Sequence, residues 1–211
     1  MTSFRLLHWG DLPYEQALLA QQQLVDALLA GEATESLILV EHPHVYTLGR
    51  GTLPHEVLNI NIHDQPVPLC ATDRGGKVTY HGPGQLVAYV IRDMRSMVMA
   101  VRNHVTLLEK SVLTTLAELG LTGETHAHAP GVWVGQAKIA ALGVRIRQGV
   151  AYHGVAINRC PDMDYFQGII PCGIQDSQVT SLAELGVSIS RTALEELYVQ
   201  HFSRLFGPVE P

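Results

Sequence analysis

Cysteine is scarce in this sequence, and its pattern argues against both a disulfide framework and a structural zinc site. The 211 residues contain three cysteines, Cys70, Cys160 and Cys172. An odd number of thiols with no secretion signal is typical of a reducing compartment and argues against a disulfide framework. Because no two cysteines form a CxxC pair, a structural zinc site has no support either. We therefore expect no metal, and reduced thiols.

Charge is also low, at 16% of the residues, and its balance is acidic, with a formal net charge of −6. A general nucleic-acid binder needs a basic face, so this class is disfavoured. No apolar stretch approaches the roughly 20 residues that a membrane helix needs. The first residues carry no basic region followed by an apolar run, and Asp11 arrives early. We expect a cytoplasmic protein that binds neither nucleic acid nor membrane.

Hydrophobic residues, in contrast, make up 46% of the chain, which is enough for a substantial core. With no low-complexity tract, no linker and no repeat, residues 1–211 are expected to form one domain. Short β-rich runs lie at 36–41, 45–48 and 84–92, and tight-turned strands at 133–158. Since helical segments flank these strands, we predict the α+β class: a mixed, mostly antiparallel sheet with helices packed against it.

Three helices are expected from apolar spacing and from start and stop residues. The first runs from Pro13 to Ala30, with Asp11 as N-cap and Gly31 as the stop. The second covers about 96–119 and ends at Gly120. The third opens with a capping box formed by Thr192 and Glu195 and ends before Gly207. The stretch 53–68 is rich in turn residues and is expected to be loop.

Cys172 is a candidate nucleophile because of its neighbours. Pro171 gives a rigid approach, and Gly173 lets the backbone turn tightly. This geometry suits a thiol presented beside free backbone N–H groups, which stabilise a thiolate or an oxyanion. The alternative is a small hydrophobic residue that fills a turn. Cys70 lies in an apolar run and is expected in the core.

Lys138 is one of only three lysines, with Lys77 and Lys110. On a strand it shares a face with Ala140, Leu142 and further apolar residues, so it points toward the core unless a bulge intervenes. An inward lysine needs a partner. It would favour the charged form of a nearby thiol. The alternative is a strand-end lysine whose amine reaches water.

The densest motif is glycine-rich and runs from Arg74 to Gln85. Paired glycines let the backbone approach a ligand, and His81 can exchange protons. No phosphate-binding fingerprint fits. A solvated glycine-rich hairpin is the alternative. A second candidate lining segment runs from His153 to Asn158.

Four pieces of the chain, in order, resemble the lipoyl(octanoyl) transferase family. They are Arg74-Gly75-Gly76 with Thr79-Tyr80-His81-Gly82-Pro83-Gly84-Gln85, then Ala137-Lys138-Ile139-Ala140, then His153-Gly154-Val155-Ala156-Ile157-Asn158, and finally Pro171-Cys172-Gly173 followed by Thr180-Ser181. The resemblance implies the fold of the catalytic domain of biotin and lipoate protein ligases. Many relatives have serine where Ala141 stands, which leaves the implied catalytic pair intact.

The resemblance also implies roles for residues. Cys172 would carry the acyl group as a thioester, and Lys138 would lower the pKa of that thiol and move protons. The acyl pocket would be lined by the following substrate-binding residues: Arg74, Gly75, Gly76, Lys77, Val78, Thr79, Tyr80, His81, Ala141, Leu142, Gly143, Gly154, Val155 and Ala156. Whether Lys138 or a histidine, His81 or His153, is the main proton shuttle stays open.

The implied reaction moves octanoyl from octanoyl acyl carrier protein to a lysine of a lipoyl domain. Acceptors would be the lipoyl domains of 2-oxoacid dehydrogenases and the glycine cleavage H protein. No cofactor and no ATP are needed because the donor thioester is already activated, and we expect a monomer. Arg145, Arg147 and Lys77 are candidates for docking an acidic carrier, or are simply solvated. The rival functions are an ATP-dependent ligase, a non-catalytic binding module and a thioesterase.

Overall fold

A computed structural model describes residues 3–95, 100–126, 129–171 and 178–211 of the chain. Within these residues a mixed sheet has the strand order β14-β1-β2-β8-β12-β11-β10-β9, and β13 pairs with β11. The strands of this sheet are β1 (Phe4–Asp11), β2 (Ser36–Glu41), β8 (Gln85–Asp93), β9 (Glu124–His126), β10 (Ala129–Val134), β11 (Ala137–Arg147), β12 (Val150–Asn158), β13 (Gln178–Val179) and β14 (Val209–Glu210).

Pairing from β2 to β9 is antiparallel throughout, whereas β1 runs parallel to both β14 and β2 and β13 runs parallel to β11. The expected α+β class with a mostly antiparallel sheet is therefore confirmed. The strand β1 is an addition, because no strand was predicted before the first helix. Asp11 ends this strand and so is not the helix N-cap.

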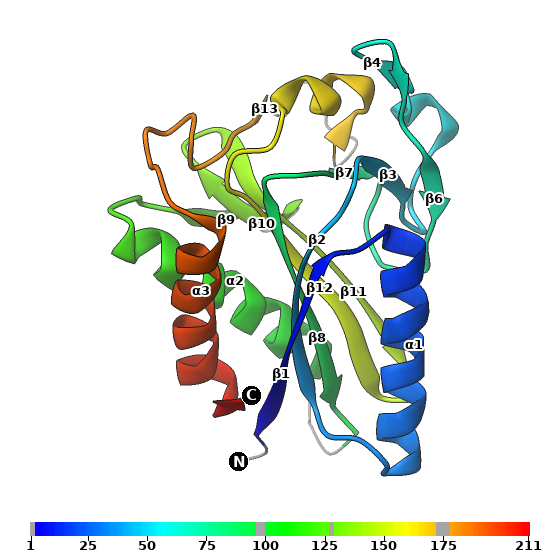
Figure 1. Cartoon of the computed structure of the whole chain (residues 1–211), viewed down its shortest axis with the longest axis vertical. Coiled ribbons are helices and arrows are strands. Elements are labelled where there is room, and N and C mark those ends of the chain that lie inside the picture. Colours follow the sequence, from blue (N-terminus) through cyan, green and yellow to red (C-terminus); the bar gives the residue numbers. More distant parts are fainter. Residues whose placement is uncertain (1–2, 96–99, 127–128, 172–177) are drawn as a thin grey trace.

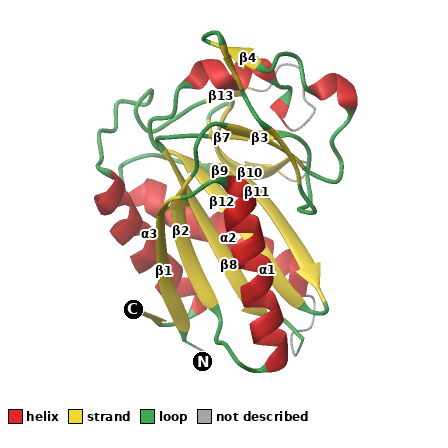
Figure 2. Ribbon diagram, turned by 45° about the vertical axis from the view of Figure 1, so that its right-hand side comes forward, coloured by secondary structure: helices red, strands yellow, loops and turns green. Residues whose placement is uncertain are grey.

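Helices cover both faces of the sheet (Figures 1 and 2). The first, α1 (Tyr14–Ala30), covers one face, and α2 (Ala100–Glu118) and α3 (Arg191–Phe206) pack together on the other. Each face has its own apolar core. Residues of β8, β11 and β12 contribute to the α2–α3 core, and residues of β2, β8 and β12 to the α1 core. Cys70 is buried in the α1 core, as expected.

The ends of the helices show which of the predicted capping residues are correct. Gly31 adopts a left-handed conformation with φ 76° and terminates α1 as predicted. At α3 the N-cap is Ser190, whose side chain accepts a hydrogen bond from the Ala193 amide. The predicted capping box of Thr192 and Glu195 is therefore wrong, since Glu195 binds the Arg191 side chain instead.

A small second layer lies beyond one end of the main sheet. It has the three-stranded sheet β6-β3-β7 and the hairpin β4-β5. The elements of this layer are β3 (Val45–Leu48), η1 (Pro54–Glu56), β4 (Asn61–Ile62), β5 (Gln65–Pro66), β6 (Leu69–Ala71), β7 (Thr79–His81) and η2 (Met163–Gly168). The stretch 53–68 is thus mainly turns and short elements, close to the loop predicted for it. No helix in the described part of the chain is long and apolar enough to cross a membrane.

Candidate active site

A cavity of about 370 Å³ lies where the second layer meets β8, β11 and β12. Of the fourteen residues predicted to line an acyl pocket, all except Tyr80 border this cavity. Tyr80 alternates with its strand neighbours Thr79 and His81, so its ring turns to the opposite side of β7. There its hydroxyl lies 2.8 Å from Nδ1 of His44.

The glycine-rich segment reaches the cavity because Arg74 turns back into the protein. Its guanidinium donates to the carbonyl and to Oγ1 of Thr47, both at 2.7 Å. The amide of Gly75 then donates to the Val144 carbonyl at 3.0 Å, which lays the segment across β11. A Cβ on Gly143 would lie 3.0 Å from Cδ of Arg74, so glycine permits this close crossing. Arg74 is thus a buried support rather than a solvated cation.

His153 stands at the edge of the cavity in a strained conformation. Its φ is +63°, in the left-handed region that non-glycine residues rarely adopt. Its Nε2 lies 2.9 Å from Asp73, and its amide donates to Gln21 of α1. The hydrogen bond from His153 is the main cause that lowers the pKa of Asp73 to about 2. Burial lowers the pKa of His153 itself, so its imidazole is held neutral.

His81 is buried, and this burial brings its pKa well below the ordinary value. Its Nδ1 lies 2.7 Å from Oε1 of Gln85, whose amide group donates to Oδ1 of Asn158 at 2.8 Å. The side-chain amide of Asn158 donates to the Thr180 carbonyl, and the Thr180 amide donates to the Lys138 carbonyl. This chain orients a neutral His81 with its proton on Nδ1. Gln85 and Asn158 line the cavity too. Asn158 ends the second candidate lining segment, and Gln85 ends the glycine-rich motif, although Gln85 was not among the predicted lining residues.

Lys138 is buried, with 5% of its surface exposed, and borders the cavity. Its Nζ donates to the Pro130 carbonyl at 2.8 Å and lies 5.1 Å from the centre of the Trp133 ring. The inward orientation predicted from strand phase is therefore confirmed, and the alternative of an amine in water is excluded. Gly131 leaves the space for this side chain, because a Cβ there would lie 2.6 Å from Cε of Lys138.

Cys172 and Gly173 lie outside the described residues, so the structure gives no contact for the predicted nucleophile. The residue before it, Pro171, borders the cavity. The chain leading to Pro171 is held in place, since the amide of Ile170 donates to the Glu56 carbonyl at 2.8 Å. Predicted lining residues, Lys138 and Pro171 thus surround one cavity.

The predicted docking cations all have acidic partners inside the chain. Lys77 pairs with Glu56, and Arg147 pairs with Asp26 of α1. Arg145 lies 3.9 Å from Asp73. Each of these three cations is therefore paired with a carboxylate and is not simply solvated.

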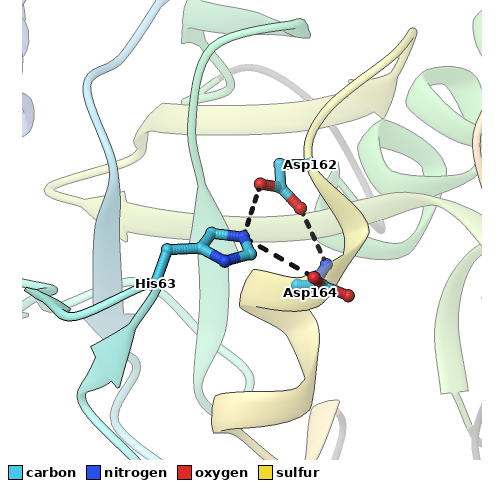
Figure 3. A group of neighbouring side chains, drawn as sticks. All are labelled: His63, Asp162 and Asp164. Carbon is cyan, nitrogen blue, oxygen red and sulfur yellow. Dashed lines mark hydrogen bonds and ion pairs between the residues drawn. The ribbon is translucent and has the colours of Figure 1, made fainter.

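One further cluster of titratable groups lies in the second layer, between β4 and η2 (Figure 3). Nε2 of His63 lies 2.9 Å from Asp162 and 3.6 Å from Asp164. All three side chains are exposed, and Asp162 caps η2 by accepting from the Asp164 amide. The cluster therefore fastens the β4–β5 hairpin to η2 and needs no ligand to explain it.

Comparison with known proteins identifies the family of the chain. Residues 13–203 match the family model described as lipoyl protein ligase A/B catalytic domain. An octanoyltransferase of Magnetococcus marinus is 50% identical over 202 residues, which cover 96% of this chain and 93% of the relative. The chain belongs to the octanoyltransferase family.

Solved structures show how widely the fold of this octanoyltransferase family member is shared. A lipoate-protein ligase A bound with ATP superposes with a TM-score of 0.82 at 17% identity, covering 99% of this chain and 90% of the ligase. A biotin protein ligase from Aquifex aeolicus gives 0.53 at 12% identity, covering 97% and 68% of the two chains. The expected likeness to the catalytic domains of lipoate and biotin ligases is confirmed.

Proposed function

We propose that residues 1–211 form a single acyltransferase domain that moves octanoyl from acyl carrier protein to a lysine of lipoyl domains. The acceptors would be the lipoyl domains of 2-oxoacid dehydrogenases and the glycine cleavage H protein. The observation that carries the proposal is the buried Lys138 amine at a mainly apolar cavity that also contains Pro171, the neighbour of Cys172 in sequence. The name of the 50%-identical relative supports the same acyl group.

The first half-reaction forms an acyl-enzyme. The thiolate of Cys172 attacks the carbonyl carbon of the carrier-bound octanoyl thioester, and a new carbon–sulfur bond forms. The bond to the carrier sulfur breaks, and that sulfur leaves as a thiolate, which takes a proton to become the carrier thiol. Lys138, as an ammonium, would favour the thiolate of Cys172 and supply this proton.

The second half-reaction moves the acyl group to nitrogen. The neutral amine of the acceptor lysine attacks the thioester carbonyl, the carbon–sulfur bond breaks, and the thiolate of Cys172 is released. The new amide nitrogen loses a proton, which the Lys138 amine formed in the first half accepts. Lys138 is favoured over a histidine as the shuttle because burial lowers the pKa of both His81 and His153. No ATP enters, because the donor is already a thioester.

The cavity supports an acyl occupant by its shape and lining. Val78, Val87, Leu142 and Val155 supply apolar surface, and the glycine backbones of Gly75 and Gly143 widen the space near β11. The proposal includes a cytoplasmic location and a monomer. The free thiols of Cys70 and Cys160 agree with a reducing compartment.

The test is the intact mass of the protein after mixing with octanoyl acyl carrier protein, without ATP. Wild type is expected to gain one octanoyl group that hydroxylamine removes, and Cys172→Ser is expected to gain none by this route. Adding a lipoyl domain should then transfer the group to its lysine. If neither protein gains mass, and the lipoyl domain is labelled only when free octanoate and ATP are supplied, the chain is a ligase and the transfer mechanism is wrong.

A further inference from the structure

One peptide group, between Pro130 and Gly131 on β10, contacts two oppositely charged side chains. Its carbonyl oxygen accepts from Nζ of Lys138 at 2.8 Å. Its N–H, on Gly131, donates to Oε1 of Glu109 at 3.3 Å. A carboxylate and an ammonium therefore bind opposite ends of the same amide.

Glu109 reaches this amide from α2, which packs on the α2–α3 face of β10 and β11. Its side chain is half-buried. Burial raises the pKa of Glu109, whereas the Gly131 amide and the charge of Lys138 lower it. A carboxylate brought out of water needs such compensation, and here it comes from the amide and from Lys138.

Among the described residues, no other pair of charged side chains contacts this amide. The strand β10 contains no charged side chain. The ring of His126 stacks on Trp133 with the ring centres 4.7 Å apart, and His126 in turn contacts Glu124. Glu109 and Lys138 are the groups whose hydrogen bonds reach the Pro130–Gly131 amide.

We propose that Glu109 is a positioning residue that holds the Lys138 amine aimed at the cavity, acting through the Pro130–Gly131 peptide group. A carboxylate at the N–H end polarises the amide and makes its carbonyl oxygen a stronger acceptor for the ammonium. Its meaning for catalysis rests on the proposed function, in which Lys138 must start as an ammonium.

A glycine at position 131 is needed for the Pro130–Gly131 amide to contact both side chains. Its φ of 142° and the absence of a side chain let the amide lie against Lys138. Glu109→Gln is therefore the informative variant, because a glutamine oxygen still accepts from the Gly131 amide while the charge is lost. Glu118→Gln removes one negative charge from the same helix but at a site that binds His201, so it is the matched control.

The test measures how fast each lysine is acetylated by trace acetic anhydride at one fixed pH. Because the chain has only Lys77, Lys110 and Lys138, peptide mass spectrometry resolves every lysine. In Glu109→Gln the acetylation of Lys138 should be roughly tenfold faster, because its amine is held less firmly by the Pro130 carbonyl. The acetylation of Lys110 should not change, and Glu118→Gln should leave Lys138 as in wild type.

The activity of the same variants separates this inference from the proposed function. In Glu109→Gln the kcat of octanoyl transfer should fall while the KM for the acyl donor stays near that of wild type, because the amine is displaced and the cavity is not. An unchanged Lys138 acetylation rate in a folded Glu109→Gln protein overturns the role of Glu109, even if octanoyl transfer is normal. Faster acetylation of Lys138 with no octanoyl transfer in wild type would support Glu109 and contradict the proposed function.

Discussion

Gly131 sets the position of Lys138, and its substitution tests how tightly that position is held. In Gly131→Ala the added Cβ meets Cε of Lys138 at 2.6 Å and the Ala140 carbonyl at 2.7 Å, on a backbone with positive φ. We expect a loss of about 2–4 kcal/mol of unfolding free energy, from strain and overpacking together. Octanoyl transfer should fall more than stability alone explains, because the amine is displaced. Urea denaturation and transfer rates measure the two effects.

Gly135→Ala is the control for that substitution. Gly135 also has positive φ, at 59°, but no atom lies within 4 Å of the place of its Cβ. The Gly135→Ala variant should therefore lose only about 1 kcal/mol of unfolding free energy, from the strained backbone conformation, and its octanoyl-transfer rate should not change. Equal losses of activity in the two variants would show that Gly131 matters only through backbone conformation.

Residue patterns predicted only part of the site. Strand alternation predicted the inward orientation of Lys138, whereas the acyl-pocket role of residues 74–81 came from the family resemblance. The resemblance placed Tyr80 among the lining residues, but its ring turns to the other side of β7. Alternation along a strand could not show this, because only the fold sets which residues face the cavity. Glu109 was missed for a similar reason. Nothing near Glu109 in the sequence of the helix indicates that it will lie close to a lysine on β11.

At the scale of elements, several polar residues near the start of α3 are candidates for its N-cap. Ser190, Thr192 and Glu195 all fit some part of an N-terminal motif, and the structure selects Ser190. Ser190→Ala should cost about 1 kcal/mol of unfolding free energy because the Ala193 amide loses its acceptor. Thr192→Ala should cost a few tenths of a kcal/mol at most, since Thr192 lies inside the helix and Ser190 is the residue that caps it.

The measurement is a pair of urea titrations at pH 7, compared with wild type. Equal costs for the two variants, or a larger cost for Thr192→Ala, would contradict the observed cap. The missing strand β1 has a different cause from the misplaced cap, which is a local contact between Ser190 and Ala193. The strand depends on pairing with β2 and β14 in the sheet, and Arg191 of α3 binds the carbonyl of Gly10 within it. Such long-range contacts leave no periodic trace in sequence.

For the whole molecule, buried neutral histidines link stability to pH. Burial lowers the pKa of His42 and of His104 from 6.5 to about 4, and lowers those of His81 and His153 as well. Below pH 6.5 the unfolded chain therefore binds protons that the folded chain does not bind until about pH 4. Unfolding free energy should fall steadily as the pH is lowered from 7 to 4.5.

His104→Leu isolates one member of this group. Neither ring nitrogen of His104 has a hydrogen-bond partner among the described residues, and the ring lies against Phe206. Leucine removes an unsatisfied polar group, so stability at pH 7 should rise by about 1–3 kcal/mol. The shift from 6.5 to about 4 corresponds to on the order of 3 kcal/mol of pH-linked stability, most of which the variant should no longer lose on going to pH 4.5.

The pH range matters to this test because protonation of carboxylates also lowers the stability of the folded chain. Asp73, with its pKa lowered to about 2, adds stability that is present above about pH 4 and lost only as the pH falls toward 2. Urea titrations between pH 7 and pH 4.5 therefore report mainly on the histidines. A His104→Leu variant that loses as much stability as wild type over this range would show that His104 is protonated in the folded chain, and that the α2–α3 core admits a charge.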